Sequence, residues 1–167
     1  MTDPGDRPVR VLPETADPDT GGFFAAAARE ELAVCACAAC GAVLHLPRAF
    51  CAGCGSWDTV WRTVSGRGRL CSWTTVEHQA HRAFPVPYTI VLVEVEDAAE
   101  ARLVGYLPGR PELEAGMPMR VWFEPVDDDG TCLPQWRPDA SAGGAPVGVR
   151  AGESFVRGYP NVAIDPR

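Results

Sequence analysis

The amino-acid sequence predicts a mainly β protein with a short N-terminal helix, a small cysteine-based ribbon and a five-stranded barrel. Two C-x-x-C pairs lie only ten residues apart. From Trp61 to Pro138, short β-branched and aromatic stretches alternate with turns rich in Gly, Pro and Asp. An alanine-rich stretch before the cysteines predicts the helix. The 167 residues suffice for about one domain with appended segments.

The cysteine pairs predict a structural zinc site. Cys37 and Cys40 form the first pair, Cys51 and Cys54 form the second, and a glycine follows each pair. Zn²⁺ prefers a tetrahedral shell of thiolates at about 2.3 Å, and two intervening residues let one tight turn direct both sulfurs at the same ion. The glycine permits the positive φ with which the backbone leaves such a turn. We therefore expect one Zn²⁺ with four thiolate ligands and no open position for catalysis.

Disulfides, redox chemistry and an iron–sulfur cluster are the alternatives for these cysteines. Disulfides require an oxidising compartment, whereas the first residues are acidic and proline-rich and lack the apolar segment of a signal peptide. A thioredoxin-like redox pair would account for one C-x-x-C but not for two. The other cysteines show no partner spacing: Cys35, Cys71 and Cys132. We expect a cytoplasmic protein with structural zinc.

Two segments precede the ribbon. Residues 1–21 contain four prolines among acids and glycines and have too few apolar residues for a core, so we expect a flexible acidic segment. Residues 22–33 are rich in alanine, free of helix breakers and predict one helix that runs into the ribbon. Phe23 and Phe24 at its start could anchor the helix to a core or form a docking surface, and the sequence leaves both open.

The ribbon is expected over residues 34–60 and the barrel over residues 61–138. Residues 43–50, between the cysteine pairs, are expected to supply hairpin strands, with His45 on the surface because four sulfurs complete the metal shell. Five short antiparallel strands in the barrel region fit an OB-fold. They are expected at 69–77, 88–95, 102–106, 119–124 and 131–136. Residues 139–167 read as a linker and C-terminal tail.

The charge distribution argues against nucleic-acid and membrane partners. The net charge is −7, from 15 basic against 22 acidic residues. The ribbon region is neutral, with Arg48 against Asp58, and the barrel region carries 11 acidic residues against 8 arginines. Phosphate-backbone binding needs a basic footprint, which no segment has. The longest apolar run has the length of a strand, far below the roughly 20 residues that cross a bilayer.

In order and spacing, these elements resemble the DUF35 family, in which a rubredoxin-like zinc ribbon is joined to an OB-fold. The resemblance covers about residues 20–138. Besides the two C-x-x-C pairs, its markers are a helix ending at Leu32 and five short stretches: Val64-Ser65-Gly66-Arg67-Gly68, Ser72-Trp73-Thr74, Val86-Pro87-Tyr88, Val93-Glu94-Val95 and Gly116-Met117-Pro118-Met119. Residues 96–100 depart from the shorter turn of the family, and the two terminal segments have no family counterpart.

The resemblance implies a non-catalytic role in acyl-CoA metabolism. Family members are implied to be partners of thiolase-fold enzymes, which include thiolases and lipid-transfer-protein-like aldolases or synthases. Some are paired with MaoC-like hydratases, and they are thought to help hold the acyl-CoA. On this basis we expect a zinc-binding accessory subunit of an acyl-CoA-processing complex, with no nucleic-acid or membrane partner.

The residues themselves offer little for catalysis by this chain alone. A nucleophile near a base would be needed, and the candidates are Cys71, Cys132, His78 and His81. Both cysteines lie in predicted strands, where they alternate as small apolar residues would. Pro85 prevents a zinc-binding helix around the two histidines. We therefore expect no catalytic residue in this chain.

The loop 78–87, between the first two barrel strands, contains the candidate substrate contacts. OB-folds bind ligands with one barrel face and its flanking loops. Arg82 could pair with a CoA phosphate and Phe84 could cover a pantetheine or adenine, with His81 beside them. The alternative is an ordinary surface loop with Phe84 tucked against the barrel. Arg67 and Arg69 flank the same strand and complete the set of candidates.

Single-stranded nucleic-acid binding is the alternative function, because zinc ribbons and OB-folds both serve it. It would need stacking aromatic side chains interleaved with positive charge along a groove. Trp73, Tyr88, Tyr106 and Trp122 supply aromatic rings, but the 8 arginines against 11 acids leave the barrel region at −3. We therefore place this function second.

Overall fold

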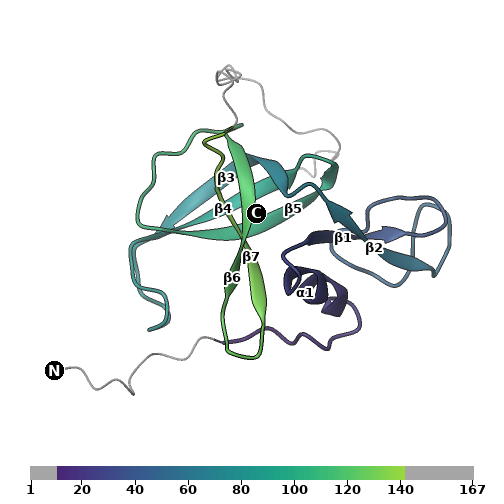
Figure 1. Ribbon diagram of the computed structural model, residues 1–167. Coiled ribbons are helices and arrows are strands. Elements are labelled where there is room, and N and C mark those ends of the chain that lie inside the picture. Colours follow the sequence, from purple (N-terminus) through teal and green to yellow (C-terminus); the bar gives the residue numbers. More distant parts are fainter. Residues whose placement is uncertain (1–10, 142–167) are drawn as a thin grey trace, which may run out of the picture.

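The computed structural model describes residues 11–141, in which a short helix lies against two β units (Figure 1). Helix α1 (Gly21–Ala27) leads into a two-stranded sheet of β1 (Leu32–Cys37) and β2 (Thr59–Val64). The second sheet has the strand order β5-β4-β3-β6-β7. Its strands are β3 (Arg67–Val76), β4 (Tyr88–Val95), β5 (Ala98–Pro108), β6 (Pro118–Pro125) and β7 (Cys132–Pro138). The predictions for residues 1–10 and for the tail from residue 142 lie outside the described residues.

The second sheet confirms the predicted mainly β fold with its five-stranded barrel. All of its ladders are antiparallel. Strand β3 pairs with β4 along its length but with β6 only over Arg67–Arg69, and a bulge interrupts it between Leu70 and Ser72. Cys71, expected to alternate as a regular strand residue, lies at this bulge and is half-exposed. The bulge bends the strand so that it takes part in both halves of the barrel.

The two edge strands, β5 and β7, meet through side chains. Gln135 of β7 is buried, and its Oε1 accepts a hydrogen bond of 2.8 Å from the backbone N–H of Tyr106 in β5. One residue away, Trp136 is fully buried, and a Cβ added to Gly105 would lie 2.9 Å from its indole Cδ1. Glycine therefore permits the close approach that closes the barrel.

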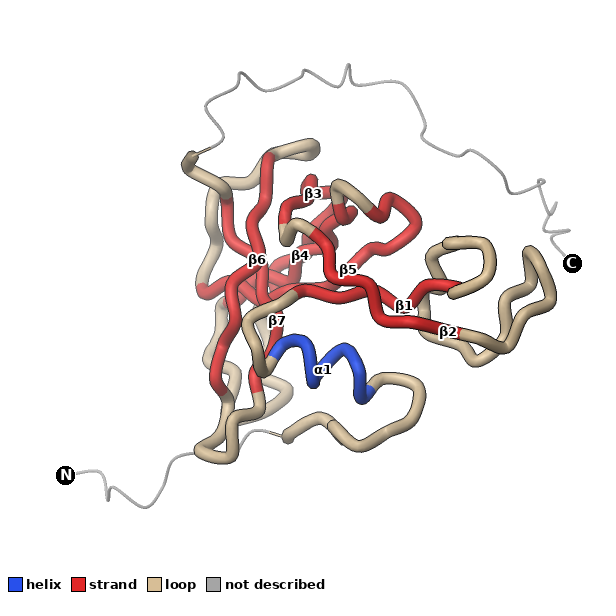
Figure 2. The backbone as a smooth tube through the Cα atoms, turned by 45° about the vertical axis from the view of Figure 1, so that its right-hand side comes forward, coloured by secondary structure: helices blue, strands red, loops and turns tan. Residues whose placement is uncertain are grey.

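The two units share one apolar core. Strand β4 buries alternate residues, as a strand with one face on a core does, and its other face is half-buried. Leu32 and Val34 of β1 belong to the same buried cluster as Leu70 and Trp136 of the barrel. The helix packs between β7 and the β1–β2 sheet (Figure 2). The ribbon is therefore fixed to the barrel by common packing.

The helix is shorter than the predicted segment 22–33. It ends at Ala27, and Glu30 takes a φ of +58°, which reverses the chain so that Leu32 starts β1. Helix propensity is a weak preference that tertiary burial overrides. Here the competing burial is that of Leu32, which is only 2% exposed.

The strands of the ribbon also differ from the prediction. The paired strands β1 and β2 flank the cysteine turns, whereas residues 43–50 contribute only an isolated bridge between Ala36 and Val43. Pro47 lacks the N–H that a ladder would need, and the segment instead spans the gap between the two turns. Within residues 11–141, no helix is long and apolar enough to cross a membrane.

Candidate metal centre and apolar surfaces

The four predicted zinc ligands come together at one end of the β1–β2 sheet. Their Sγ atoms all lie within 4.8 Å of one another. The Cys37–Cys54 separation is 3.5 Å and the Cys40–Cys51 separation is 3.7 Å. Sulfurs arranged tetrahedrally at about 2.3 Å from zinc are about 3.8 Å apart. The donor set therefore fits one zinc ion.

Two similar turns position these sulfurs. The backbone N–H of Gly41 donates to the carbonyl of Cys37 (2.9 Å), and that of Gly55 donates to the carbonyl of Cys51 (2.8 Å). Both glycines have positive φ, +75° and +78°, as the sequence predicts. Residues that have a Cβ atom rarely adopt a positive φ, so glycine is favoured at both positions. The two turns thus form a pair of matching knuckles.

The electrostatics of the cluster favour a cation. A hydrogen bond from the backbone N–H of Cys40 lowers the pKa of Cys37 to about 6. The backbone N–H of Ser56 acts in the same direction on Cys54, but the neighbouring thiols of Cys37 and Cys40 outweigh it and raise the pKa of Cys54 to about 12. Adjacent thiolates repel each other, and a divalent cation offsets this repulsion. The chain therefore has a closed, structural site for one zinc ion.

The five predicted substrate contacts fall into two separate groups. Arg67 and Arg69 begin β3, whereas His81, Arg82 and Phe84 follow its other end. Strand β3 has 10 residues, which at about 3.3 Å per residue is a path of roughly 30 Å along the chain. The two groups therefore lie at opposite ends of β3.

Arg67 and Arg69 contact the β4–β5 turn and the β5–β6 connection, respectively. Arg67 Nε lies 2.9 Å from a carboxylate oxygen of Glu96, and Arg69 donates to the carbonyl of Gly116 (3.2 Å). Next to Glu96, Asp97 accepts hydrogen bonds from the backbone N–H and the hydroxyl of Ser65. The acidic turn that departs from the family pattern thus holds the start of β3.

Phe84 packs against the barrel, as in the alternative interpretation of its loop. Its ring centroid lies 6.1 Å from that of Tyr88 and 6.0 Å from that of Tyr106, and these two tyrosine rings are 5.3 Å apart. His81 stands outside this cluster, 6.0 Å from Phe84, and its Nδ1 accepts from the backbone N–H of Ala83. His81 and Arg82 are exposed. The loop therefore places the imidazole of His81 at the rim of an aromatic cluster.

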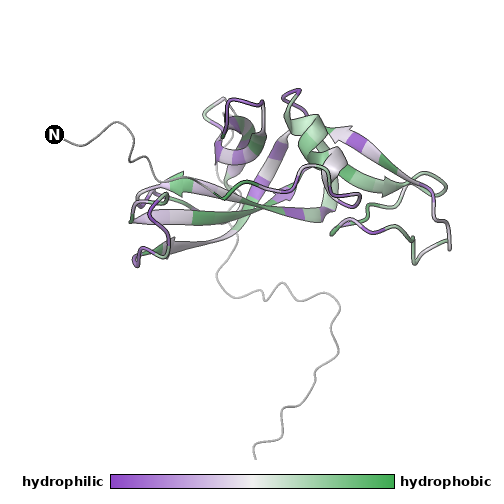
Figure 3. Cartoon of the chain, turned by 90° about the horizontal axis from the view of Figure 1, so that it is seen from below, coloured by the Kyte–Doolittle hydropathy of each residue, from purple (hydrophilic) through white to green (hydrophobic). Residues whose placement is uncertain are grey.

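The ribbon exposes large apolar side chains that the sequence analysis did not single out. Leu46 is 73% exposed and Trp57 is 72% exposed, with Phe50 and Val60 at 40% and 48%. The rings of Phe50 and Trp57 are 5.1 Å apart. We call these four residues the ribbon surface. Apolar colouring extends over α1 and the ribbon in Figure 3. Sequence alone does not show that a tryptophan beside a metal knuckle is exposed.

A groove of about 210 Å³ separates helix α1 from the ribbon. Its apolar walls include Phe23, Phe24, Leu44, Leu46 and Trp61. Leu46 belongs both to this helix–ribbon groove and to the ribbon surface. Phe23 also packs against the common core. The sequence left open whether Phe23 anchors the helix to a core or forms a docking surface. In the structure Phe23 anchors the helix and also lines an open groove.

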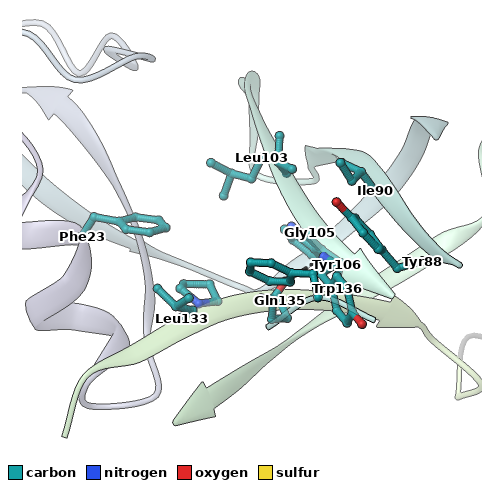
Figure 4. A pocket seen from close by; sticks show the side chains of 12 residues that line it. Phe23, Tyr88, Ile90, Leu103, Gly105, Tyr106, Leu133, Gln135 and Trp136 are labelled. Carbon is teal, nitrogen blue, oxygen red and sulfur yellow. Dashed lines mark hydrogen bonds between the residues drawn. The ribbon is translucent and has the colours of Figure 1, made fainter. Parts of the chain in front are cut away.

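A second cavity, of about 440 Å³, lies where β5 and β7 meet beside α1, and we call it the seam cavity. Figure 4 shows Phe23 on one side of it and Tyr88 and Ile90 on the other. Its full lining is Phe23, Phe84, Tyr88, Ile90, Leu103, Val104, Gly105, Tyr106, Leu133, Pro134, Gln135 and Trp136. No charged side chain lines this cavity.

Comparisons with known proteins agree with this architecture. The family model of the rubredoxin-like zinc ribbon domain of ChsH2 matches residues 24–58, and that of the ChsH2 C-terminal OB-fold domain matches residues 61–124. A probable enoyl-CoA hydratase alpha subunit from Thermomonospora curvata is 36% identical over 138 residues, covering 79% of this chain. The match covers 41% of that relative, so the chain spans less than half of its length.

Two solved structures are also similar. The Ltp2–ChsH2(DUF35) aldolase matches with a TM-score of 0.69 and 33% identity, over 76% of this chain and 98% of the matched chain. A DUF35-family protein of unknown function from Sulfolobus solfataricus matches with a TM-score of 0.51 and 16% identity, over 75% of this chain and 89% of its own, and supports the fold. With its four-cysteine ribbon joined to an OB-fold, the chain belongs to the DUF35 family.

Proposed function

We propose that this protein is a non-catalytic, zinc-binding accessory subunit that docks on a thiolase-fold enzyme and helps to hold its acyl-CoA substrate. The observation that carries the proposal is the ribbon surface, where Leu46 and Trp57 are about three-quarters exposed on an electrically neutral unit. The similarity to the Ltp2–ChsH2(DUF35) aldolase favours a lipid-transfer-protein-like aldolase or thiolase as the partner. The name of the T. curvata relative makes a MaoC-like hydratase the second candidate partner.

The chemistry of the ribbon surface suits a protein partner. Exposed apolar patches on small proteins mark interaction sites, and interface centres are enriched in aromatic residues and depleted of charge. Trp57 and Phe50 supply the aromatic anchors, and the helix–ribbon groove offers a concavity for a side chain of the partner. The surface therefore has the components of an interface centre.

Zinc gives this surface its shape. The ribbon cluster of buried residues is small and consists largely of cysteines, with Leu44 and Trp61. Below about 40 residues, a unit usually needs metals, disulfides or association to fold. The ion thus fixes the loops that carry Leu46, Phe50 and Trp57, and its proposed role is structural.

The proposed substrate contacts are those of the loop 78–87. His81 and Arg82 are exposed, and His81 lies at the rim of the aromatic cluster, so both are suited to the polar part of an acyl-CoA that enters from a bound enzyme. Arg67 and Arg69 are assigned to stabilising β3, because their contacts with Glu96 and Gly116 serve the fold. Two of the four aromatic residues that nucleic-acid binding would use, Tyr88 and Tyr106, line a cavity whose lining has no charged side chain among the described residues.

The docking proposal is tested by co-expression with a lipid-transfer-protein-like aldolase and co-purification. Trp57→Arg places a charge on the ribbon surface and should reduce complex formation at least tenfold while zinc content stays at one ion per chain. Trp73→Arg is the control, because Trp73 is also an exposed tryptophan, at 41%, but lies on the barrel and does not line the seam cavity. If Trp57→Arg assembles normally, or if the unaltered chain fails to bind any thiolase-fold enzyme, the proposal is wrong.

A further inference from the structure

We infer that the seam cavity binds the uncharged acyl portion of the thioester and not its nucleotide. This inference deepens the proposed function and depends on it for the identity of the ligand as a thioester. It assigns to the chain itself the recognition of the apolar end of the substrate. The cavity volume, about 440 Å³, lies in the range of small-molecule sites.

The lining excludes an anionic ligand. Gln135 has the amide side chain of the lining, and both ends of that amide are already used; the other polar side chains there are the two tyrosines and Trp136. The Oε1 of Gln135 accepts from the backbone of Tyr106, and its Nε2 donates to Glu124 (3.0 Å). A phosphate in this cavity would lose its hydration without gaining a cationic partner, which is strongly unfavourable.

Aromatic rings form the walls. Phe84, Tyr88 and Tyr106 make one continuous cluster, with neighbouring centroids 5.3–6.1 Å apart. Phe23 of α1 lies across the cavity from Tyr88 (Figure 4). Rings supply a large apolar contact area with little conformational freedom to lose, so they suit an aliphatic or alicyclic group.

One buried donor in the wall is closed off from a ligand. Trp136 lines the cavity and is fully buried, and its indole Nε1–H has no hydrogen-bond partner among residues 11–141. The Cδ1 edge of the indole, which is bonded to Nε1, packs directly against Gly105, where even one added Cβ would lie only 2.9 Å from Cδ1. No ligand atom fits at this edge, so Trp136 contributes apolar ring surface to the cavity and no hydrogen bond.

The experiment measures binding of three probes to the full chain by isothermal titration calorimetry. The probes are free CoA, octanoyl-CoA and octanoyl-N-acetylcysteamine, which carries the acyl thioester without the nucleotide. Each methylene that is buried raises affinity roughly fourfold. We expect octanoyl-CoA to bind about tenfold or more tightly than free CoA, and the nucleotide-free thioester to retain most of that gain.

Two substitutions on one face of β4 locate the binding. Ile90 lines the seam cavity and Leu92 does not, although both are half-buried and lie two residues apart on the same side of the strand. Ile90→Trp fills the cavity and should weaken octanoyl-N-acetylcysteamine at least tenfold, whereas Leu92→Trp should leave it unchanged. Far-UV circular dichroism and zinc content verify that both variants fold.

Three outcomes would overturn the inference: no binding of the octanoyl probes, equal binding of free CoA and octanoyl-CoA, or equal losses in the two variants. None of them affects the docking test, because that test measures how much complex the Trp57→Arg variant forms with the enzyme. A chain that binds acyl groups but no enzyme, or an enzyme but no acyl groups, therefore separates the two proposals.

Discussion

The backbone N–H of Tyr106 donates a hydrogen bond of 2.8 Å to the side-chain oxygen of Gln135, which joins the two edge strands of the barrel. An edge strand normally leaves such donors to solvent or to another chain. Here one buried side chain supplies the acceptor, and its own N–H groups are satisfied in part by Glu124.

Substituting Gln135 should therefore destabilise the barrel. Gln135→Leu leaves the N–H of Tyr106 without an acceptor, and we expect a loss of about 1–3 kcal/mol in the free energy of unfolding. Urea denaturation measures it. Gln79→Leu is the control, because Gln79 is exposed and makes only a long contact of 3.5 Å, so a change within about 0.5 kcal/mol is expected. Equal effects would mean that the bond between the edge strands contributes nothing.

The close approach of β5 and β7 makes Gly105 sensitive to the smallest substitution. In Gly105→Ala the new Cβ would lie 2.9 Å from the indole Cδ1 and 3.0 Å from the backbone nitrogen of Trp136. Overpacking of this kind costs about 1–3 kcal/mol. In Gly53→Ala the nearest atom would be the Cys51 sulfur at 3.8 Å, an ordinary contact. Thermal unfolding of the two variants should differ accordingly, and an unchanged Gly105→Ala protein would refute the tight seam.

Cys40→Ser should abolish stoichiometric zinc binding and, with it, partner binding, because the ion holds the loops of the ribbon surface. Cys35→Ala is the matched control. Cys35 lies in the same ribbon, where burial raises the pKa of its thiol, but it is not one of the four clustered ligands. Elemental analysis should give one zinc per chain for Cys35→Ala and much less for Cys40→Ser. Normal assembly of a zinc-free Cys40→Ser chain would show that the metal is dispensable for docking.

The turn between β6 and β7 should respond to acid through Asp127. Hydrogen bonds from the side chain and then the backbone of Thr131 lower the pKa of Asp127 below its ordinary value near 3.8. A depressed pKa means that these bonds stabilise the fold above that ordinary value and are lost as the pH falls through the lower, folded-state value. Carboxyl NMR titration should show the depressed pKa, and Thr131→Val should move it upward. An ordinary pKa in the unaltered chain would contradict this assignment.

The features that depend on local sequence were predictable. Tyr88–Val95 forms the strand expected from its β-branched residues, and the C-x-x-C-Gly spacing identified the zinc ligands because each knuckle is a short-range turn. The end of α1 was missed because the burial of Leu32 in a distant core decides it. The end of the helix depends on a tertiary contact, which local helix propensity does not predict.

The two apolar sites could not be predicted for the same reason. The seam cavity combines Phe23, Tyr106 and Trp136, which are far apart in the chain and meet only when the barrel closes beside the helix. Trp57 lies three residues after Cys54 and is 72% exposed. The sequence shows which residues are apolar, but it does not distinguish an apolar residue buried in the core from one exposed on a surface that binds a partner.

The participation of Leu32 and Val34 in the barrel core has a consequence for modularity. Although sequence families divide the molecule near residue 60, the buried core crosses that division, so we expect the two parts to unfold together. A fragment cut there would expose core residues on both pieces. Removing the zinc ion with a chelator should therefore lower the melting temperature of the barrel as well as that of the ribbon.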